Sequence, residues 1–247
     1  MAIALTAQDY NQGISNEISC FGDSLTQGYM ASSATGPSYP QHLSNIFYPR
    51  LVQNFGLGSQ TMEQIASRQG ARPIYITVTN NTIVTGGTAT AITSISSRFL
   101  TNSDPGVKFA SGIVNGIPCI IIRNSTTEDY SIFGALYAGG AVPPNSIFYP
   151  DSSFNALPTI QVFWWGKNNL PNLNGLDTLI DKAIEIMPSP RRFLVIGVLP
   201  SLNEVVGTTN YNVIIAMNAI LKANYPNNYI ESTPPTVAEM AYIMYIP

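Results

Sequence analysis

The sequence has little charge of either sign. Only 10% of its 247 residues are charged and the net charge is −3, whereas an average soluble domain is roughly 25% charged. The 11 lysines and arginines are scattered along the chain, and binding to nucleic acid needs a clustered basic face. Nucleic acid is therefore not expected as a partner.

Histidine, cysteine and long apolar runs are scarce as well. The single histidine, His42, and the two cysteines, Cys20 and Cys119, show no metal-ligand spacing, so we expect neither a metal nor a cofactor. Both cysteines lie in apolar runs, which favours buried free thiols over a disulfide. No apolar run reaches the roughly 18 residues of a membrane span, and the first residues lack the basic start of a signal peptide. A membrane partner is therefore not expected.

Uncharged polar residues take the place of the missing charge. Apolar residues make up 45% of the chain, which is enough for a well-formed core. Asn, Thr, Ser, Gly and Pro supply much of the remainder. A surface solvated by neutral groups is typical of extracellular or virion-associated proteins and of surfaces that face sugars.

Two parts of the chain, residues 1–70 and 152–247, alternate between strand-like and helix-like patterns. The expected strands are residues 17–21, 50–55, 159–165, 192–199 and 229–231, and the expected helices are residues 40–47, 62–68, 176–187 and 210–223. Strands that alternate with helices form parallel sheets. The near-continuous apolar run at 192–199 is typical of a strand buried on both faces. These parts predict one α/β domain with a five-stranded parallel sheet.

Residues 71–151 have a different character. Short alternating apolar runs are separated by Asn-Gly and Gly-Gly turns, the pattern of antiparallel hairpins. We predict an inserted antiparallel β subdomain here. We also expect it to lie over the carboxyl edge of the parallel sheet, with both connections leaving from that side.

The run Phe21-Gly-Asp-Ser-Leu-Thr-Gln-Gly-Tyr29 carries the clearest chemical signal. It places Ser24 just past the end of the first predicted strand, at the edge where open α/β sheets build their sites. A serine in this position can also be a helix N-cap. The whole run, directly after a strand, favours a nucleophile over a cap.

Two more short runs follow predicted strands, Asn54-Phe-Gly-Leu-Gly-Ser-Gln-Thr61 and Trp165-Gly-Lys-Asn-Asn169. With the Gly-Asp-Ser run they resemble, in order, the first three of the four blocks that define the SGNH, or GDSL, hydrolase superfamily. The resemblance covers most of residues 17–231 outside the insertion. It implies a three-layer, flavodoxin-like α/β fold and acyl-transfer chemistry. Taken singly, a glycine-rich turn or an asparagine-rich turn is common and carries little weight.

The resemblance also implies roles for particular residues. Ser24 would be the nucleophile, and the backbone N–H groups of Ser24 and Ser59 with the Asn168 amide would bind the oxyanion. Ser59 stands where the family has glycine, and its N–H serves equally well unless the position needs a positive φ. Supporting roles are implied for three neighbours, Asp23, Gly58 and Asn169.

The fourth block of the family, Asp-x-x-His, has no match. No histidine follows residue 229, although a serine nucleophile needs a neighbouring base. His42 is expected on a helix surface rather than at the site. We favour a chain that stops short of the Asp-x-x-His part, so that a missing segment, a separate chain or a partner subunit of a homo-oligomer supplies the base. The alternative is a degenerate homologue that has no catalytic activity and serves only in binding or as a structural part.

The function predicted from the sequence is a serine ester hydrolase of the SGNH type, and most specifically a carbohydrate O-acetyl esterase. Its partner would be an acylated carbohydrate such as a polysaccharide, with a phage-tail location suggested by resemblance. Tyr29, Trp164 and Trp165 are candidate stacking faces, although core packing is favoured for the two tryptophans. The alternative is a non-catalytic glycan-binding or structural module of a larger assembly. A lipase is disfavoured because the insertion is too polar for an apolar lid.

Overall fold

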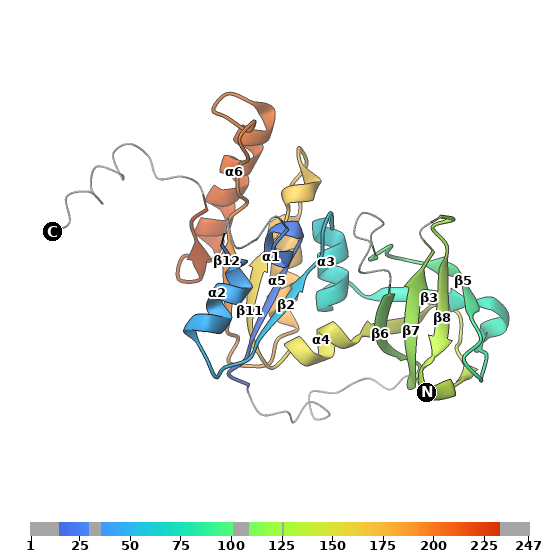
Figure 1. The fold of residues 1–247 in the computed structure, drawn as a ribbon. Helices are drawn as coiled ribbons and strands as arrows, with labels where there is room; N and C mark the ends of the chain where they lie inside the picture. The colour runs from blue at the N-terminus through green and yellow to red at the C-terminus, as the bar shows by residue number, and fades with distance from the viewer. Residues whose placement is uncertain (1–14, 30–35, 101–108, 125, 233–247) are drawn as a thin grey trace, which may run out of the picture.

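A computed structural model describes residues 15–29, 36–100, 109–124 and 126–232. The described chain forms two β assemblies, an open five-stranded parallel sheet and a closed antiparallel barrel (Figure 1). The chain is therefore mixed α/β, and the predicted parallel sheet is confirmed.

The parallel sheet consists of the five strands predicted from the sequence. They are β1 (Ile18–Gly22), β2 (Val52–Gly56), β11 (Ile160–Trp164), β12 (Phe193–Ile196) and β13 (Tyr229–Ile230). Their order is β13-β12-β11-β1-β2, and every pair is parallel. The chain moves outward from β1 to β2 and then returns to the other side of β1 as β11. The switch point at which such sheets bind ligands therefore lies between β1 and β11.

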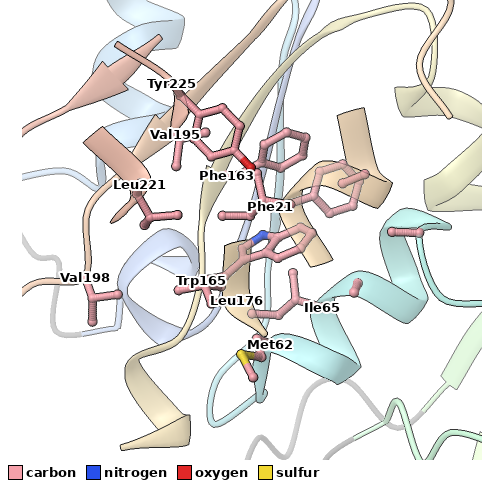
Figure 2. Close-up of a cluster of buried hydrophobic side chains, with 14 of the residues drawn as sticks. Phe21, Met62, Ile65, Phe163, Trp165, Leu176, Val195, Val198, Leu221 and Tyr225 are labelled. Atoms are coloured by element: carbon pink, nitrogen blue, oxygen red, sulfur yellow. The ribbon is translucent and has the colours of Figure 1, made fainter. Parts of the chain in front are cut away.

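Helices pack on both faces of this sheet. They are α1 (Ser24–Gln27), α2 (Tyr39–Ile46), α3 (Met62–Gln69), α5 (Leu176–Glu185) and α6 (Thr209–Asn224). Apolar residues of α3, α5 and α6 enclose Phe21, Phe163 and Trp165 in the larger core (Figure 2). On the other face, Tyr39 and Leu43 of α2 pack against a smaller cluster that includes Cys20.

The inserted segment is antiparallel, and it closes on itself. The barrel strands are β3 (Ile74–Val78), β5 (Thr90–Ile95), β6 (Phe109–Val114), β7 (Ile117–Arg123), β8 (Tyr130–Gly134) and β10 (Ser146–Pro150), with β10 paired to both β3 and β6. Two short strands, β4 (Thr82–Ile83) and β9 (Gly140–Ala141), pair with each other outside the barrel. The barrel has its own apolar core, which includes Ile76, Phe99, Ile121 and Phe148. Short helical segments complete the described chain: η1 (Thr79–Asn81), η2 (Ala135–Tyr137), α4 (Asp151–Ala156) and η3 (Lys167–Asn169).

The predicted side of attachment is wrong. α3 follows β2 and runs back along the sheet, so its C-cap, Gly70, lies toward the amino ends of the strands. α4 then leads into the first residues of β11, at the same amino side. The Ser152 hydroxyl of α4 donates to the Arg68 carbonyl of α3 at 2.7 Å and ties the two connections together. The barrel thus lies beside α3 and the β2 edge rather than over the carboxyl edge (Figure 1).

Two expectations based on composition can be compared with the described residues. Cys20 and Cys119 are free and buried, as predicted, and burial raises the pKa of both thiols to about 12. Such thiols are unreactive at neutral pH. Within the described ranges, no helix has the length and apolar character needed to cross a membrane.

Candidate active site

Ser24 lies where β1 turns into α1. A Cβ on Gly22 would lie 2.0 Å from Thr26 Oγ1, so the tight turn requires glycine at this point. The helix is capped by Asp23, whose Oδ1 accepts from the Leu25 N–H at 2.9 Å. Because Asp23 is the cap, the Ser24 hydroxyl is not needed for capping, and it makes no hydrogen bond to any other described residue.

The second loop, residues 57–60, lies directly beside the first. The Leu57 N–H donates to the Gly22 carbonyl at 3.1 Å, and a Cβ on Gly56 would lie 2.0 Å from the Gln27 nitrogen. Ser59 is exposed and has a φ of 60°, the left-handed region that favours glycine. The position therefore has the positive φ for which glycine is suited, and serine occupies it with some strain.

The third loop carries Asn168 and Asn169 and is fastened to the second. Asn168 Nδ2 donates to the Gln60 carbonyl at 3.0 Å. Asn169 Oδ1 accepts from the Met62 N–H at 2.8 Å, and its Nδ2 donates to Glu63 Oε2 at 3.0 Å. Since an amide nitrogen carries two hydrogens, Asn168 keeps a second N–H for another acceptor.

The three predicted blocks therefore meet at one edge of the sheet. Gly22 is in register with Gly56 on one side and with Trp164 on the other, so the loops after β1, β2 and β11 leave adjacent strand ends. Ser24, Ser59 and Asn168 each belong to one of these loops, and Gly58 precedes Ser59 in its loop. Their roles as nucleophile and oxyanion donors remain a prediction.

A buried acid lies next to Ser24. Asp23 is 1% exposed, and its Oδ2 has no hydrogen-bond partner among the described residues. Burial raises the pKa of Asp23 to about 6, against the opposing effects of the Leu25 N–H and the Lys167 charge. The carboxyl group therefore titrates close to neutral pH.

Lys167 and Glu204 form an ion pair on the neighbouring loops. Lys167 Nζ contacts Glu204 Oε2 and also donates to the Leu199 carbonyl at 3.1 Å. Burial acts to raise the pKa of Glu204, but hydrogen bonds from Lys167 and from the Ser201 N–H outweigh it and lower that pKa. The Lys167 side chain is therefore engaged by Glu204 and by the Leu199 carbonyl.

His42 is exposed on α2. Its side chain makes no hydrogen bond to another described residue. This placement agrees with the interpretation as a surface histidine, and the described part of the chain supplies no histidine base for Ser24. Within the same residues, no group of three or more His, Cys, Asp or Glu side chains could hold a metal ion.

The aromatic candidates have different surroundings. Trp165 is 2% exposed and belongs to the larger core (Figure 2), as favoured from the sequence. Trp164 is half-buried, donates from Nε1 to the Gly197 carbonyl at 2.9 Å and packs edge-on against Tyr39. Tyr29 is 74% exposed, and its N–H donates to the Ser24 carbonyl at 2.9 Å. Of the three rings, Tyr29 is the one available for stacking near Ser24.

Sequence reasoning missed two residues that organise these loops, Gln60 and Arg68. Gln60 is fully buried and Arg68 is 5% exposed. Arg68 Nε donates to Gln60 Oε1 at 2.7 Å, and Arg68 Nη2 donates to the Phe55 carbonyl at 2.7 Å. One signal was available, because Arg68 follows the apolar Ile65 by three residues and so falls on the buried face of its helix.

Comparisons with known proteins give a fold likeness only. No family model matches the sequence, and no curated protein matches it. Among solved structures, the chain is similar to the SGNH-hydrolase family esterase AlinE4, with 13% identity, a TM-score of 0.41, and coverage of 94% of this chain and 92% of that chain. A mutant of AlinE4 gives 12% identity, a TM-score of 0.41 and coverage of 94% and 92%. A second mutant gives 13% identity, a TM-score of 0.39, and coverage of 95% of this chain and 98% of that chain. With likeness this low, the functional assignment depends on this chain's own residues.

Proposed function

We propose that the chain is a serine ester hydrolase of the SGNH type, with Ser24 as its nucleophile. The observation that carries this proposal is the position of Ser24 at the end of β1, next to the switch point of the sheet, with a hydroxyl that makes no hydrogen bond to another described residue. Two further loops with N–H donors are fastened beside it. A nucleophile that faces neutral donors is the arrangement that acyl transfer needs.

The reaction follows from these groups. Ser24 Oγ attacks the ester carbonyl carbon and gives up its proton to a base. The developing oxyanion accepts hydrogen bonds from the Ser24 and Ser59 N–H groups and from the second N–H of Asn168, each worth about 10²–10³ in rate. The alcohol leaves with the proton, and water then hydrolyses the acyl-enzyme. We propose that the base is a histidine from another segment or from a partner subunit.

The proposed substrate is an O-acetylated carbohydrate such as a polysaccharide. Three features favour a neutral, hydroxyl-rich ligand: the low charge of the chain, the Thr- and Asn-rich insertion, and the exposed Tyr29 ring. Aromatic faces beside neutral polar groups suit sugar rings, which present both C–H and O–H groups. Such a substrate agrees with an extracellular or virion-associated location, which we propose with it.

Added imidazole tests the chemistry directly because it can replace an absent histidine base. We expect the chain alone to hydrolyse p-nitrophenyl acetate barely above background, since removing the base leaves about 10³–10⁴-fold acceleration over water. Imidazole should raise the rate well above that of Ser24→Ala with the same imidazole. Equal rates for the two chains at every imidazole concentration would refute a nucleophilic Ser24. Acetate release from acetylated glycans, followed by mass spectrometry, then tests the substrate class.

The second candidate is a non-catalytic glycan-binding or structural module. The exposed position of His42, the single histidine of the sequence, favours it. This function predicts saturable sugar binding that Ser24→Ala leaves unchanged. It also predicts no labelling by a serine-directed fluorophosphonate, even when imidazole is present. Labelling at Ser24 would exclude it.

A further inference from the structure

Gln60 joins three parts of the molecule through its hydrogen bonds. Its carbonyl accepts from Asn168 Nδ2 at 3.0 Å. Its side-chain Oε1 accepts from Arg68 Nε at 2.7 Å, and its Nε2 donates to the Phe99 carbonyl of the barrel at 2.5 Å. One buried residue thus links the third loop, α3 and the barrel.

The barrel end of this link is itself well anchored. Phe99 and Leu100 are fully buried in the barrel core, and Phe99 stacks on Phe148. The Leu100 N–H donates to Tyr130 Oη at 3.2 Å, and Arg123 Nη1 donates to the Leu100 carbonyl at 2.7 Å. The Phe99 carbonyl is therefore a fixed acceptor.

The other side of the link carries a buried charge. Among the described residues, the Arg68 guanidinium donates to two uncharged acceptors, the Gln60 side chain and the Phe55 carbonyl. Burial lowers the pKa of Arg68 to about 9, so the side chain is still charged at neutral pH. Burying a cation without an anionic partner is costly unless its hydrogen bonds are well satisfied. The hydrogen bonds that offset this cost join the guanidinium to Gln60 on one side and to Phe55, near the end of β2, on the other.

We infer that Gln60 is a positioning residue, through which the barrel holds the loop of Ser59 and the Asn168 amide in place. The barrel is then a structural part of the site rather than an appended module. The inference rests on the proposed function. Ser59 precedes Gln60 and keeps a left-handed backbone that is unfavourable for a non-glycine residue, so its loop relaxes once Gln60 is released.

A pair of matched variants separates this role from general stabilisation of the interface. Gln64 Nε2 donates to the barrel carbonyl of Arg98 at 2.6 Å, while its Oε1 accepts from the Thr61 N–H at 3.0 Å. Gln60→Glu and Gln64→Glu each replace a donor to a barrel carbonyl by an acceptor. Each keeps its remaining bond, to Arg68 or to Thr61, and in Gln60→Glu that bond becomes an ion pair with the Arg68 guanidinium. Of the two glutamines, it is Gln60 whose carbonyl accepts from the Asn168 amide.

The first measurement is hydrogen–deuterium exchange in the full chain, which needs no catalysis. Gln60→Glu should speed exchange in residues 57–61 by at least tenfold and leave the apparent melting temperature close to that of Gln64→Glu. Gln64→Glu should leave exchange at residues 57–60 unchanged. If Gln60→Glu does not fold, Gln60→Asn, which shortens the side chain without adding charge, takes its place.

The second measurement is the imidazole-supported turnover of p-nitrophenyl acetate. A displacement of about 1 Å in a catalytic group can cost about 10² in rate, so Gln60→Glu should lower kcat by about 10- to 100-fold with little change in KM. Gln64→Glu should stay within twofold of the unaltered chain. Normal exchange in Gln60→Glu, or equal effects of the two variants, would overturn the positioning role. Absence of any Ser24-dependent turnover would instead count against the proposed function, while the exchange result would still decide whether Gln60 positions the loop.

Discussion

The buried carboxyl of Asp23 leads to a quantitative prediction about stability and pH. The native fold raises the pKa of Asp23 from 3.8 to about 6 because the side chain is buried. A carboxyl with a raised pKa binds its proton more tightly in the folded than in the unfolded chain. Its contribution to stability is therefore full below about pH 4 and is lost as the pH rises through about 6.

The size of this loss follows from the shift. Roughly two pKa units at 1.36 kcal/mol each give about 3 kcal/mol. Asp23→Asn does not titrate, and its side-chain oxygen can still accept from the Leu25 N–H and cap α1. We expect its stability relative to the unaltered chain to rise by up to about 3 kcal/mol between pH 4 and pH 8.

Urea denaturation of the two chains at half-unit steps from pH 4 to pH 8 measures this difference. Asp23→Ala, which removes the cap as well, serves as the control and should carry an additional, pH-independent loss of about 1 kcal/mol. If the stability curves of the unaltered chain and Asp23→Asn ran parallel throughout, the reasoning on the buried carboxylate would be refuted.

Three further substitutions test the site. His42→Ala should leave thermal stability and imidazole-supported turnover unchanged, and a loss of turnover would show that our placement of the base is wrong. Ser59→Gly should raise the free energy of unfolding by about 0.5–1 kcal/mol in urea titrations, because glycine adopts a positive φ without strain, and it should keep turnover because the donor is a backbone N–H. Gly56→Ala should cost at least about 2 kcal/mol in the same titrations, since its Cβ would meet the Gln27 nitrogen at 2.0 Å; a neutral effect would contradict the close approach of β2 to α1.

The regular elements of the α/β domain could be predicted because their signals are local. The buried run at 192–199 contains β12, and the helical periodicity of residues 176–187 contains α5. The Gly-Asp-Ser run could be placed at a strand end for the same reason. In each case the pattern of apolar residues along a short segment shows which side chains face the core.

The closure of the barrel and its side of attachment could not be predicted in this way. Alternation identifies a strand but not its partner, and the pairing of β10 with β6 joins segments more than thirty residues apart. The side of attachment, by contrast, follows from the direction of the helix before the insertion. A helix after a parallel strand runs back to the amino edge, so an insertion that begins after Gly70, the C-cap of α3, leaves from that edge.

The organisation of the site was also beyond local patterns. The bond between Gln60 and Phe99 joins residues 39 positions apart, and neither belongs to a motif. A buried glutamine in a loop looks like any surface glutamine in sequence, because its burial depends on the barrel that covers it. The three sequence motifs therefore predict the candidate catalytic residues, whereas the residues that position those motifs can be identified only from the structure.

The contact between α3 and α4, which lead into and out of the barrel, affects how the chain folds. In the parallel sheet β1 pairs with β11, and the paired residues 18 and 160 are about 140 residues apart in the sequence. If the barrel forms first, it brings residues 70 and 151 together, and the loop left to close is about 60 residues long. The entropic contribution to the free energy of closing that loop is then smaller by about 0.8 kcal/mol. The barrel would therefore act as a folding nucleus for the sheet. Destabilising substitutions in the barrel core should accordingly slow refolding of the parallel sheet, although the two share no strand.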